Sequence, residues 1–331
     1  MSARRVVVTG GCGFVGSHLV ERLVARGDEV TVFDGAPYPA DLDDDVRKQA
    51  RHVRGDIRDA DALTAAIRPG TDAVYHLAAV VGVDQYLARP LDVIDVNFTG
   101  TRNVLEAAAR AGAKVVAAST SEVYGKNPVV PWAEDGDRVL GPTTADRWTY
   151  STSKALAEHM TFAFARQHGL EATVVRYFNV YGARQRPAYI VSRTVHRVLN
   201  GLAPVVYDQG LQTRCFTHVS DCVEGTVLAA EKPSAAGGVF NIGSMDETTV
   251  GEAVRLVAEL AGSDGAVIEV DTKDRLGPAY EDLLRRVPDN SRARTELGWT
   301  CGTSLRDGLA DTIAWARAHP WWLALPDNGA L

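Results

Sequence analysis

The sequence predicts an α/β fold in which a doubly wound parallel sheet is followed by a smaller C-terminal lobe. Short β-branched runs alternate with amphipathic helical stretches through the first half of the chain, and each run is apolar along its length, as parallel strands covered on both faces are. The predicted strands are Val6–Thr9, Glu29–Phe33, Ala73–Leu77, Lys114–Ala118 and Thr173–Arg176. The predicted helices between them are Ser17–Arg26, Asp59–Ile67, Thr99–Ala111 and Ser151–His168.

The rhythm changes after about Gly182, where the elements become shorter and glycine, proline and arginine more frequent. We interpret residues 1–182 as the sheet domain. Residues 183–331 are then a smaller lobe that is interleaved with the last strands of the sheet. A chain of 331 residues is long enough to bury the core that this arrangement needs.

Bulk composition argues against several classes of protein. The net charge of −7, from 42 acidic and 35 basic residues, disfavours sequence-independent nucleic-acid binding, which needs a basic surface. The four cysteines form no CxxC pair and the eight histidines show no HxxxH or HExxH spacing, so we expect neither a metal site nor a disulfide framework. No apolar run has membrane-spanning length, and Val6–Val8 is too short for a signal-peptide core. We therefore expect a soluble, cytoplasmic protein.

A glycine-rich turn follows the first predicted strand and opens a helix, with Gly10, Gly13 and Gly16 spaced three apart. In a dinucleotide-binding Rossmann fold the first glycine permits a tight turn, the second lets backbone approach a pyrophosphate, and the third lets helix and strand pack closely. The N–H groups at the start of the helix then face the phosphates. Asp34 ends the second strand, where a carboxylate can bind ribose hydroxyls and repel a 2′-phosphate. This favours NAD over NADP, although an acid that caps a loop would give the same pattern.

Tyr150 and Lys154 lie one helical turn apart on one face of a predicted helix. An ammonium group near a phenol lowers the phenol pKa from its usual value of about 10, so that the phenolate can accept a proton from a hydroxyl while a hydride leaves for the nicotinamide. A polar run follows the strand Lys114–Ala118: the hydroxyls of Ser119, Thr120 and Ser121 can bind the reacting oxygen, and Glu122 is a possible second acid–base group. The alternative is a polar strand end made of residues that favour turns.

Further ordered motifs cover nearly the whole chain. They are TGxxGFxG at Thr9–Gly16, His76–Ala79, Asn97, the SEVYG run Ser121–Gly125, Tyr150 with Lys154, Arg176–Gly182, Gln212–Asp221 and Asn241–Gly243. Together they resemble the NAD-dependent epimerase/dehydratase family, extended short-chain dehydrogenases that act on nucleotide sugars. The resemblance implies an NAD-binding domain that carries the catalytic residues and a smaller lobe that binds a nucleotide sugar, with a UDP-sugar favoured. It also implies a homodimer formed through two helices per subunit, here Thr99–Ala111 and Ser151–His168.

The expected site combines these two lines of reasoning. Asp56 and Ile57, which we place after a further strand, can bracket the adenine ring, although an exposed loop aspartate would look the same. The predicted NAD contacts are Gly10, Gly13, Phe14, Val15, Gly16, Asp34, Asp56, Ile57, Leu77, Ala78, Ala79, Asn97, Ser119, Tyr150, Lys154 and Tyr177. The predicted substrate contacts, which the resemblance implies, are Tyr86, Asn179, Arg186, Arg214 and Arg286. The predicted catalytic residues are Tyr150, Lys154, Thr120, Ser121, Glu122 and Arg286.

Three reactions are open once the C4 hydroxyl of a sugar has become a ketone. The keto sugar can turn over and be reduced from its other face, it can lose a C5 carboxylate as carbon dioxide, or it can eliminate water across C5 and C6. Each of them regenerates NAD. Epimerisation needs little beyond Tyr150, Lys154, a hydroxyl and room to rotate, and it gives Glu122 no obvious task. Decarboxylation and dehydration both use further acid–base groups near C5.

The run Thr120–Glu122, the segment from Gly141 to Ser151 and the segment Arg285–Asp289 resemble UDP-glucuronate decarboxylases, in which the arginine that matches Arg286 assists the reaction. Two features depart from that pattern. Tyr189 stands where those enzymes usually carry an arginine, and Arg184–Pro187 is more similar to epimerases. We predict decarboxylation, with 4-epimerisation as the alternative and Glu122 either a catalytic group or a hydrogen-bonded supporting acid. Dehydration is disfavoured because Ser121 replaces the dehydratase aspartate, and an NAD-sensing regulator because Tyr150 and Lys154 are retained.

Overall fold

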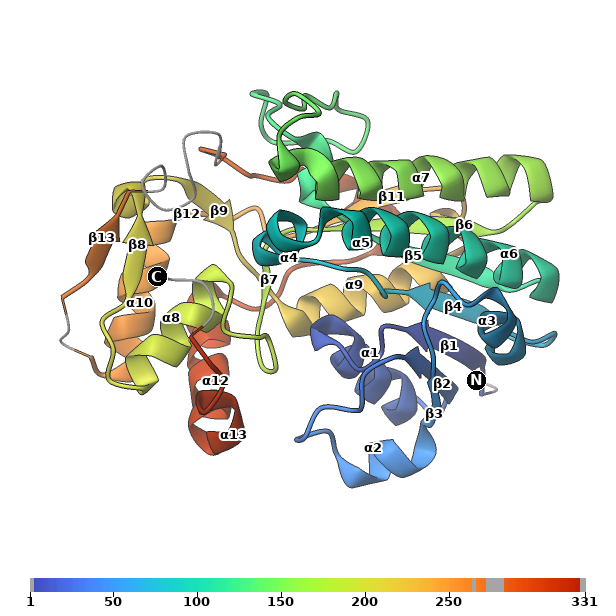
Figure 1. Cartoon of the computed structure of the whole chain (residues 1–331), viewed down its shortest axis with the longest axis horizontal. Helices are drawn as coiled ribbons and strands as arrows, with labels where there is room; N and C mark the ends of the chain where they lie inside the picture. The colour runs from blue at the N-terminus through green and yellow to red at the C-terminus, as the bar shows by residue number, and fades with distance from the viewer. Residues whose placement is uncertain (1–2, 264–265, 272–282, 328–331) are drawn as a thin grey trace.

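A computed structural model describes residues 3–263, 266–271 and 283–327, and it confirms the predicted doubly wound parallel sheet (Figure 1). Seven strands pair in parallel in the order of a Rossmann fold, in which the chain reverses direction across the sheet between β1 and β4. From one edge to the other they are β3 (Arg51–Arg54), β2 (Glu29–Asp34), β1 (Arg5–Thr9), β4 (Ala73–His76), β5 (Lys114–Thr120), β6 (Ala172–Tyr177) and β11 (Val239–Ile242).

Two strands of the sheet lie outside the predicted set. β3 is an edge strand whose four residues, Arg-His-Val-Arg, are half-buried or exposed, so it lacks the apolar run that marks the central strands. β11 comes after Gly182 in the chain but pairs with β6 in the main sheet, from Val239 opposite Val174 to Ile242 opposite Tyr177. Residues of the second half of the chain therefore complete the sheet of the first half.

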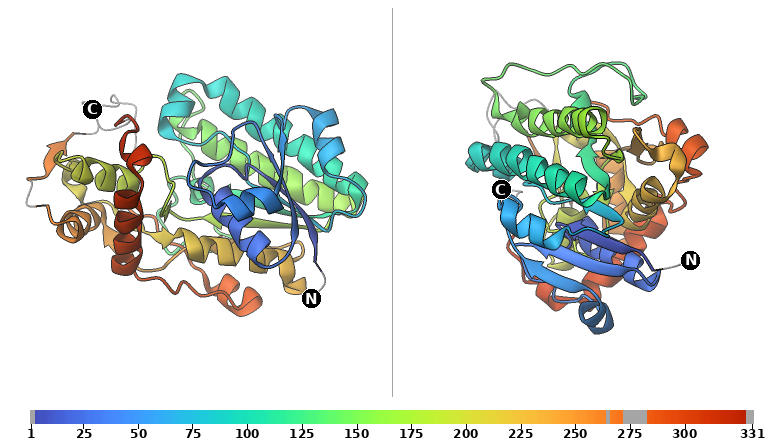
Figure 2. Two further views of the ribbon diagram at one scale, coloured as in Figure 1. Left: turned by 90° about the horizontal axis from the view of Figure 1, so that it is seen from below. Right: turned by 90° about the vertical axis from the view of Figure 1, so that its right-hand side faces the viewer.

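Helices cover both faces of the sheet (Figure 2). One face carries α3 (Ala60–Ala66), α6 (Thr101–Ala111) and α7 (Thr149–His168), with α4 (Val83–Ala88) and α5 (Pro90–Asp95) beside α7. The other face carries α1 (Phe14–Ala25), α2 (Asp44–Gln49) and α9 (Val219–Glu231). Two large clusters of buried apolar side chains fill the space between these helices and the sheet.

The predicted helix Thr99–Ala111 is the last part of a longer helical segment. α5 begins with Pro90 at its first position and passes through a π-helical turn, Val96–Gly100, into α6. Such turns are rare and occur mostly at functional sites. Asn97, which lies in this turn, is buried.

The smaller lobe packs around a third apolar cluster that includes Val195, Phe216, Val257, Ile313 and Trp322. Its helices are α8 (Ile190–Leu199), α10 (Val250–Ala261), α12 (Leu305–Ala318) and α13 (Pro320–Leu323). Its strands are β8 (Val205–Tyr207) with β13 (Ile268–Val270), and β9 (Thr213–Cys215) with β12 (Glu247–Thr249). The short parallel pair β7 (Val180–Tyr181) and β10 (Thr217–His218) joins the lobe to the sheet domain.

A buried ion pair connects α7 to β6. Arg176 donates from Nε and Nη2 to the carboxylate of Glu158 at 2.9 and 2.7 Å. Its Nη1 donates to the hydroxyl of Tyr124 at 2.8 Å, and that hydroxyl donates to Asn241 of β11 at 2.8 Å. The network joins the helix that carries Tyr150 and Lys154 to two strands of the sheet.

Among the described residues, none forms a helix long and apolar enough to cross a membrane.

Candidate active site

A cavity of about 600 Å³ opens at the C-terminal ends of β1, β2 and β4, where a doubly wound sheet binds its ligand. Among its lining residues are predicted cofactor contacts: Gly10, Gly13, Asp34, Asp56, Ile57, Leu77, Ala78 and Ala79. Its lining also includes residues that we did not predict: Cys12, Phe33, Gly35, Ala36, Arg54, Gly55 and Val96. Most of these lie in the same loops at the strand ends, so the positions of the ends of β1, β2 and β3 in the sequence could have identified them.

The three glycines of the first turn meet different demands. Gly10 has a φ of +74°, and a Cβ on it would lie 2.6 Å from the backbone nitrogen of Ala78. A Cβ on Gly16 would overlap the carbonyl oxygen of Gly10, so this glycine lets α1 pack against the turn. Gly13 has an ordinary φ of −77°, and a Cβ on it would meet only the Gly10 oxygen, at 3.3 Å. Of the three positions, Gly13 is therefore the one where a side chain requires the smallest adjustment of the backbone, whereas a ligand over the start of α1 would leave it no room.

Asp34 both caps its loop and lines the cavity. Its two carboxylate oxygens accept the backbone N–H groups of Cys12 and Ala36, each at 2.9 Å. A carboxylate oxygen can accept more than one hydrogen bond, so both retain lone pairs for the hydroxyls of a ribose. The capping role that the sequence left open and the predicted ribose role are thus compatible.

The side chains of three predicted cofactor contacts are used within the protein. Asn97 binds the backbone of Val80 and donates to Ser153 Oγ at 3.1 Å, so it holds the loop after β4 against α7. The Ser119 hydroxyl donates to Glu158, and the Tyr177 hydroxyl is bound to Thr226 of α9 at 2.8 Å. The Ser119 hydroxyl can therefore bind the reacting oxygen only as an acceptor, because its own proton is used in the hydrogen bond to the buried carboxylate of Glu158.

Tyr150 lies in the first turn of α7, and its hydroxyl is hydrogen-bonded to Thr120 at the end of β5. Burial, together with the nearby Tyr189 and Glu122, raises the pKa of Tyr150 above its usual value. The sequence predicted that Lys154 would lower the pKa of Tyr150. This prediction is wrong for the structure, because desolvation of the phenolate and the nearby Tyr189 and Glu122 raise the pKa, and the hydrogen bond with Thr120 offsets little of that rise. Tyr150 is a neutral phenol here.

Lys154 is buried one turn after Tyr150, beside a small cavity that also touches His76, Ser119 and Glu158. Burial lowers the pKa of Lys154 to about 8, while the charge of Glu158 opposes that change. His76 is neutral because burial and the charge of Lys154 lower its pKa to about 3. Lys154 is thus a cation that titrates only slightly above neutral pH.

Glu122 is held between two arginines from distant parts of the chain. Arg147 and Arg286 each donate to one of its carboxylate oxygens at 2.6 Å, and both guanidinium groups are buried. These charges hold the pKa of Glu122 far below its usual range despite its burial. Ser121 is buried next to it in the 3₁₀ turn Ser121–Tyr124. Glu122 therefore stays ionised. Arg147 is not among the predicted site residues, although its position three residues before Tyr150 is a signal in the sequence.

The predicted substrate contacts lie on both sides of the junction between the lobes. Arg186 forms an ion pair with Asp84 of α4 at 2.7 Å and lies over the Tyr189 ring. Asn179 has a φ of +37° and donates to the Cys215 carbonyl at 3.3 Å. Arg214 is buried and donates to the carbonyls of Thr213 and Leu283. Tyr86 belongs to α4, but its side chain lies outside the described part of the structure.

The residues around the large cavity fit NAD. The cavity has an acid for the ribose at Asp34, apolar walls at Ile57 and Leu77, and a helix start without a capping side chain at Gly13. Tyr150 and Lys154, on α7, lie beside the end of β5, two strands from β1 and Gly10. Within residues 3–263, 266–271 and 283–327 there is no cluster of three or more histidine, cysteine, aspartate or glutamate side chains that could hold a metal ion.

Comparison with known proteins agrees with this geometry. A family model described as "NAD dependent epimerase/dehydratase family" matches residues 6–243. A UDP-N-acetyl-alpha-D-glucosaminuronate decarboxylase of Bacillus cytotoxicus is 37% identical over 322 residues, covering 95% of this chain and 98% of that protein. Among solved structures, UDP-glucose 4-epimerase of Thermotoga maritima with UDP-glucose superposes with a TM-score of 0.85 at 30% identity, covering 96% of this chain and 99% of that one. MoeE5 in complex with UDP-glucuronic acid and NAD gives 0.84 at 34% identity, with 95% and 99% covered.

The glycine geometry predicts different effects for two single substitutions. Gly13→Ala is expected to lower the melting temperature much less than Gly16→Ala does, and to weaken NAD binding about tenfold or more, which corresponds to about 1.4 kcal/mol. Gly16→Ala, its control, should lower the stability itself by about 1–3 kcal/mol, because the new methyl group overlaps backbone. Thermal unfolding and NAD titration by calorimetry measure the two effects. Equal NAD affinity for Gly13→Ala and the unsubstituted protein would remove Gly13 from the cofactor site.

The buried Lys154 predicts an alkaline limit on activity. A folded-state pKa of about 8 means that the ammonium charge is lost as the pH rises through that value. The initial rate at saturating NAD should therefore fall above about pH 8. Lys154→Arg keeps its charge at every accessible pH, so its residual activity should lack this limb. A wild-type rate that stays level up to pH 10, about two units above that value, would show that the charge on Lys154 is not needed.

Proposed function

Because the chain belongs to the NAD-dependent epimerase/dehydratase family, we propose that it oxidises C4 of a UDP-linked hexuronate and then removes the C5 carboxylate. The observation that carries this proposal is the arrangement of Glu122, Arg147 and Arg286 next to the pair Thr120–Tyr150. An enzyme that decarboxylates an acidic sugar needs positive charge at this place, whereas an enzyme that acts on a neutral hexose does not.

The oxidation step uses Tyr150 as the acceptor of the C4 hydroxyl proton. NAD, when bound, supplies the hydride acceptor and the positive charge of its nicotinamide ring. The Tyr150 phenol is neutral in this structure, so it becomes a base only where positive charge reaches its oxygen. Lys154 carries such a charge one turn away, and the hydrogen bond with Thr120 favours the phenolate. Proton transfer from C4–OH to Tyr150 then accompanies the loss of hydride from C4.

Arg286 is the residue best placed to receive the acidic group of the sugar. Its Nη1 is used by Glu122, but its Nε is buried and has no hydrogen-bond partner among the described residues. A buried donor without a partner is costly, and a carboxylate or enolate oxygen would satisfy it. When the C5–carboxylate bond breaks, its electron pair passes into the C4 ketone as an enolate, carbon dioxide leaves, and C5 later takes a proton.

Glu122 has a positioning role in this proposal. A general acid must carry a proton, and the two arginines oppose protonation of Glu122. The permanently charged carboxylate instead fixes both guanidinium groups, from η3 (Asp146–Trp148) and from the segment after the undescribed residues 272–282. Of the two roles that the sequence allowed for Glu122, these ion pairs support that of the supporting acid.

A 4-epimerase is the second candidate, and Tyr189 is the observation that favours it. Tyr189 interacts with both Tyr150 and Arg186, so an aromatic hydroxyl lies near the reacting centre where the decarboxylase pattern carries arginine. Unlike an arginine, a tyrosine hydroxyl near the acidic sugar carries no positive charge with which to bind a C5 carboxylate. Epimerisation follows if the keto sugar can rotate before carbon dioxide leaves.

Product mass distinguishes the two reactions. We expect that incubation with NAD and UDP-glucuronate, or with UDP-N-acetylglucosaminuronate, gives a nucleotide sugar lighter by one carbon dioxide molecule. An isomer of unchanged mass would establish epimerisation instead, and unchanged substrate would favour the NAD-sensing regulator. Mass spectrometry of the nucleotide-sugar fraction makes the measurement.

Arg286 has a matched control in its neighbour Arg285, which pairs with Glu247 at the surface. Arg286→Met should reduce kcat/KM by about 10- to 100-fold, the range expected for a lost hydrogen bond to a charged group. Arg285→Met should keep nearly full activity. Both variants should still bind NAD, which separates a damaged sugar site from a damaged fold.

We also propose a cytoplasmic location. The structure supports this through its cysteines, since Cys12, Cys215, Cys222 and Cys301 are all free thiols. Thiols persist in a reducing compartment, whereas secreted proteins tend to pair them.

We propose a homodimer through α4, α5 and α7, which lie next to one another on one face of the sheet (Figure 1). Large apolar side chains are exposed here: Leu87, Leu91, Ile94 and Leu156. The exposed face of α6, in contrast, carries Arg102 and Arg110, so the apolar patch favours α5 in place of the predicted Thr99–Ala111.

Leu91 is 78% exposed, and Leu91→Glu should convert a dimer into a monomer in sedimentation velocity, with Leu202→Glu, in the other lobe, as its control. A monomeric unsubstituted protein would rule the dimer out.

A further inference from the structure

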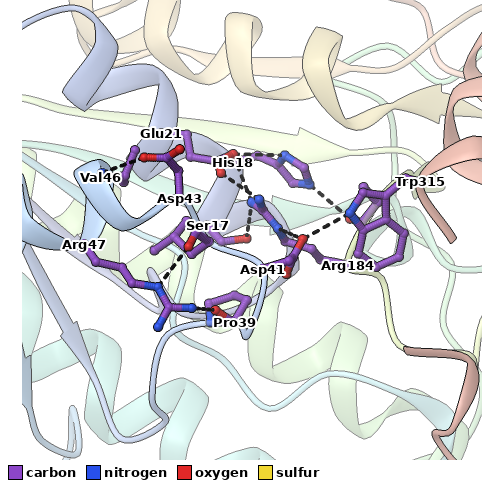
Figure 3. Close-up of polar contacts among 12 residues, drawn as sticks. Ser17, His18, Glu21, Pro39, Asp41, Asp43, Val46, Arg47, Arg184 and Trp315 are labelled. Carbon is purple, nitrogen blue, oxygen red and sulfur yellow. Dashed lines mark hydrogen bonds and ion pairs between the residues drawn. The ribbon is translucent and has the colours of Figure 1, made fainter. Parts of the chain in front are cut away.

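A cluster of charged side chains joins the cofactor domain to the smaller lobe at Arg184 (Figure 3). The guanidinium binds Glu21 of α1 through Nη1 and Nη2, at 2.9 and 2.6 Å. Its Nε donates to Asp41, in the loop between β2 and α2, at 2.8 Å. One side chain thus contacts two separate elements of the cofactor domain.

The same Asp41 oxygen is also bound from the smaller lobe. It accepts the indole N–H of Trp315, on α12, at 3.0 Å. The Asp41 carboxylate is only 5% exposed, and its second oxygen has no hydrogen-bond partner among the described residues. A buried carboxylate is stable only when it is paired, so the position of this loop depends on Arg184 and Trp315.

The loop that carries Asp41 belongs to the predicted NAD site. It starts directly after Asp34, and its first residues, Gly35 and Ala36, line the large cavity. Glu21 lies on α1, the helix whose start faces the same cavity. Without the guanidinium, the carboxylates of Glu21 and Asp41 would repel each other, which would move the loop away from the helix.

Arg184 is also fixed relative to the proposed sugar site. It has a φ of +67°, a conformation that a non-glycine residue keeps only when its surroundings enforce it. Five residues earlier lies Asn179, the proposed substrate contact, and between them β7 pairs with β10. The Gln185 amide donates to the Val180 carbonyl at 2.8 Å, and His18 of α1 binds the Ala183 carbonyl at 3.0 Å. The segment from Asn179 to Arg184 is therefore a short, stiff connection.

We propose that Arg184 is a positioning residue that couples the two ligands: a nucleoside diphosphate bound by the smaller lobe tightens the hold of the protein on NAD. The inference rests on the proposed function, because it takes a nucleotide as the ligand of that lobe. Arg184 contacts α1 and the loop after Asp34 in this arrangement, and neither ligand has to touch it. Coupling of this kind is reciprocal, so NAD must tighten the binding of the nucleotide by the same factor.

The test measures the NAD dissociation constant of NAD-stripped protein by calorimetry, with and without saturating UDP. For the unsubstituted protein we expect UDP to tighten NAD binding about fivefold or more, the lower end of typical coupling between sites. For Arg184→Met we expect weaker NAD binding and a ratio with and without UDP of about one. Arg184→Lys, which keeps the charge but cannot bridge both acids, should have a reduced ratio and guards against a failure of the methionine variant to fold.

Arg47 provides the matched control. It anchors the same loop from α2, through the carbonyls of Pro39, Ala40 and Leu42, and among the described residues it makes no hydrogen bond or ion pair with the smaller lobe. Arg47→Met should weaken NAD binding yet keep the UDP effect. If Arg184 only supported the loop, Arg184→Met should give the same outcome as Arg47→Met. A wild-type ratio in Arg184→Met, or UDP that binds without changing NAD affinity, would overturn the inference. If UDP does not bind at all, the proposed function fails. Equal NAD affinities of Arg184→Met and the unsubstituted protein would overturn the separate claim that Arg184 holds the loop in place.

Discussion

The ion pair between Arg176 and Glu158 connects the two surfaces from which the candidate site is built. It joins β6 to α7 inside the protein, and through Tyr124 and Asn241 it reaches β11. Helix α7 therefore cannot slide along the sheet without leaving one of these charges unpaired in the apolar interior. The cost of such an unpaired charge is far larger than the stabilisation that the ion pair provides. Fixing α7 in this way places Tyr150 beside Thr120 and Lys154 beside Ser119. Exact placement of the reacting groups needs such a support.

Local sequence was sufficient for most of the sheet. The central strands are short apolar runs, and the predicted ends of β1, β4 and β6 lie within two residues of those observed. The glycine turn and Asp34 were predictable because backbone geometry and cofactor chemistry act on neighbouring residues. β3 was not delimited, since an edge strand with one apolar residue carries no such signal.

The remaining features depend on contacts between residues that are far apart in the chain. Arg286 lies 164 residues from Glu122, and Arg184 lies 143 residues from Asp41. By local sequence alone, each of these arginines is indistinguishable from a solvated surface charge, and only the family resemblance singled out Arg286. The protonation state of Tyr150 was missed for a related reason, because a neighbouring lysine is visible in the sequence whereas the loss of water around the phenol is not.

The π-helical turn at Val96–Gly100 has a consequence for how the surface of this protein can change. An extra residue in a helix rotates everything after it by about 100° around the axis. The turn lets α5 present Leu91 and Ile94 to the outside while Asn97 faces inward and α6 buries Val104 and Leu105. Deleting one residue there would bring the two halves of the helix out of phase, so insertions and deletions in this segment would be tolerated less than substitutions.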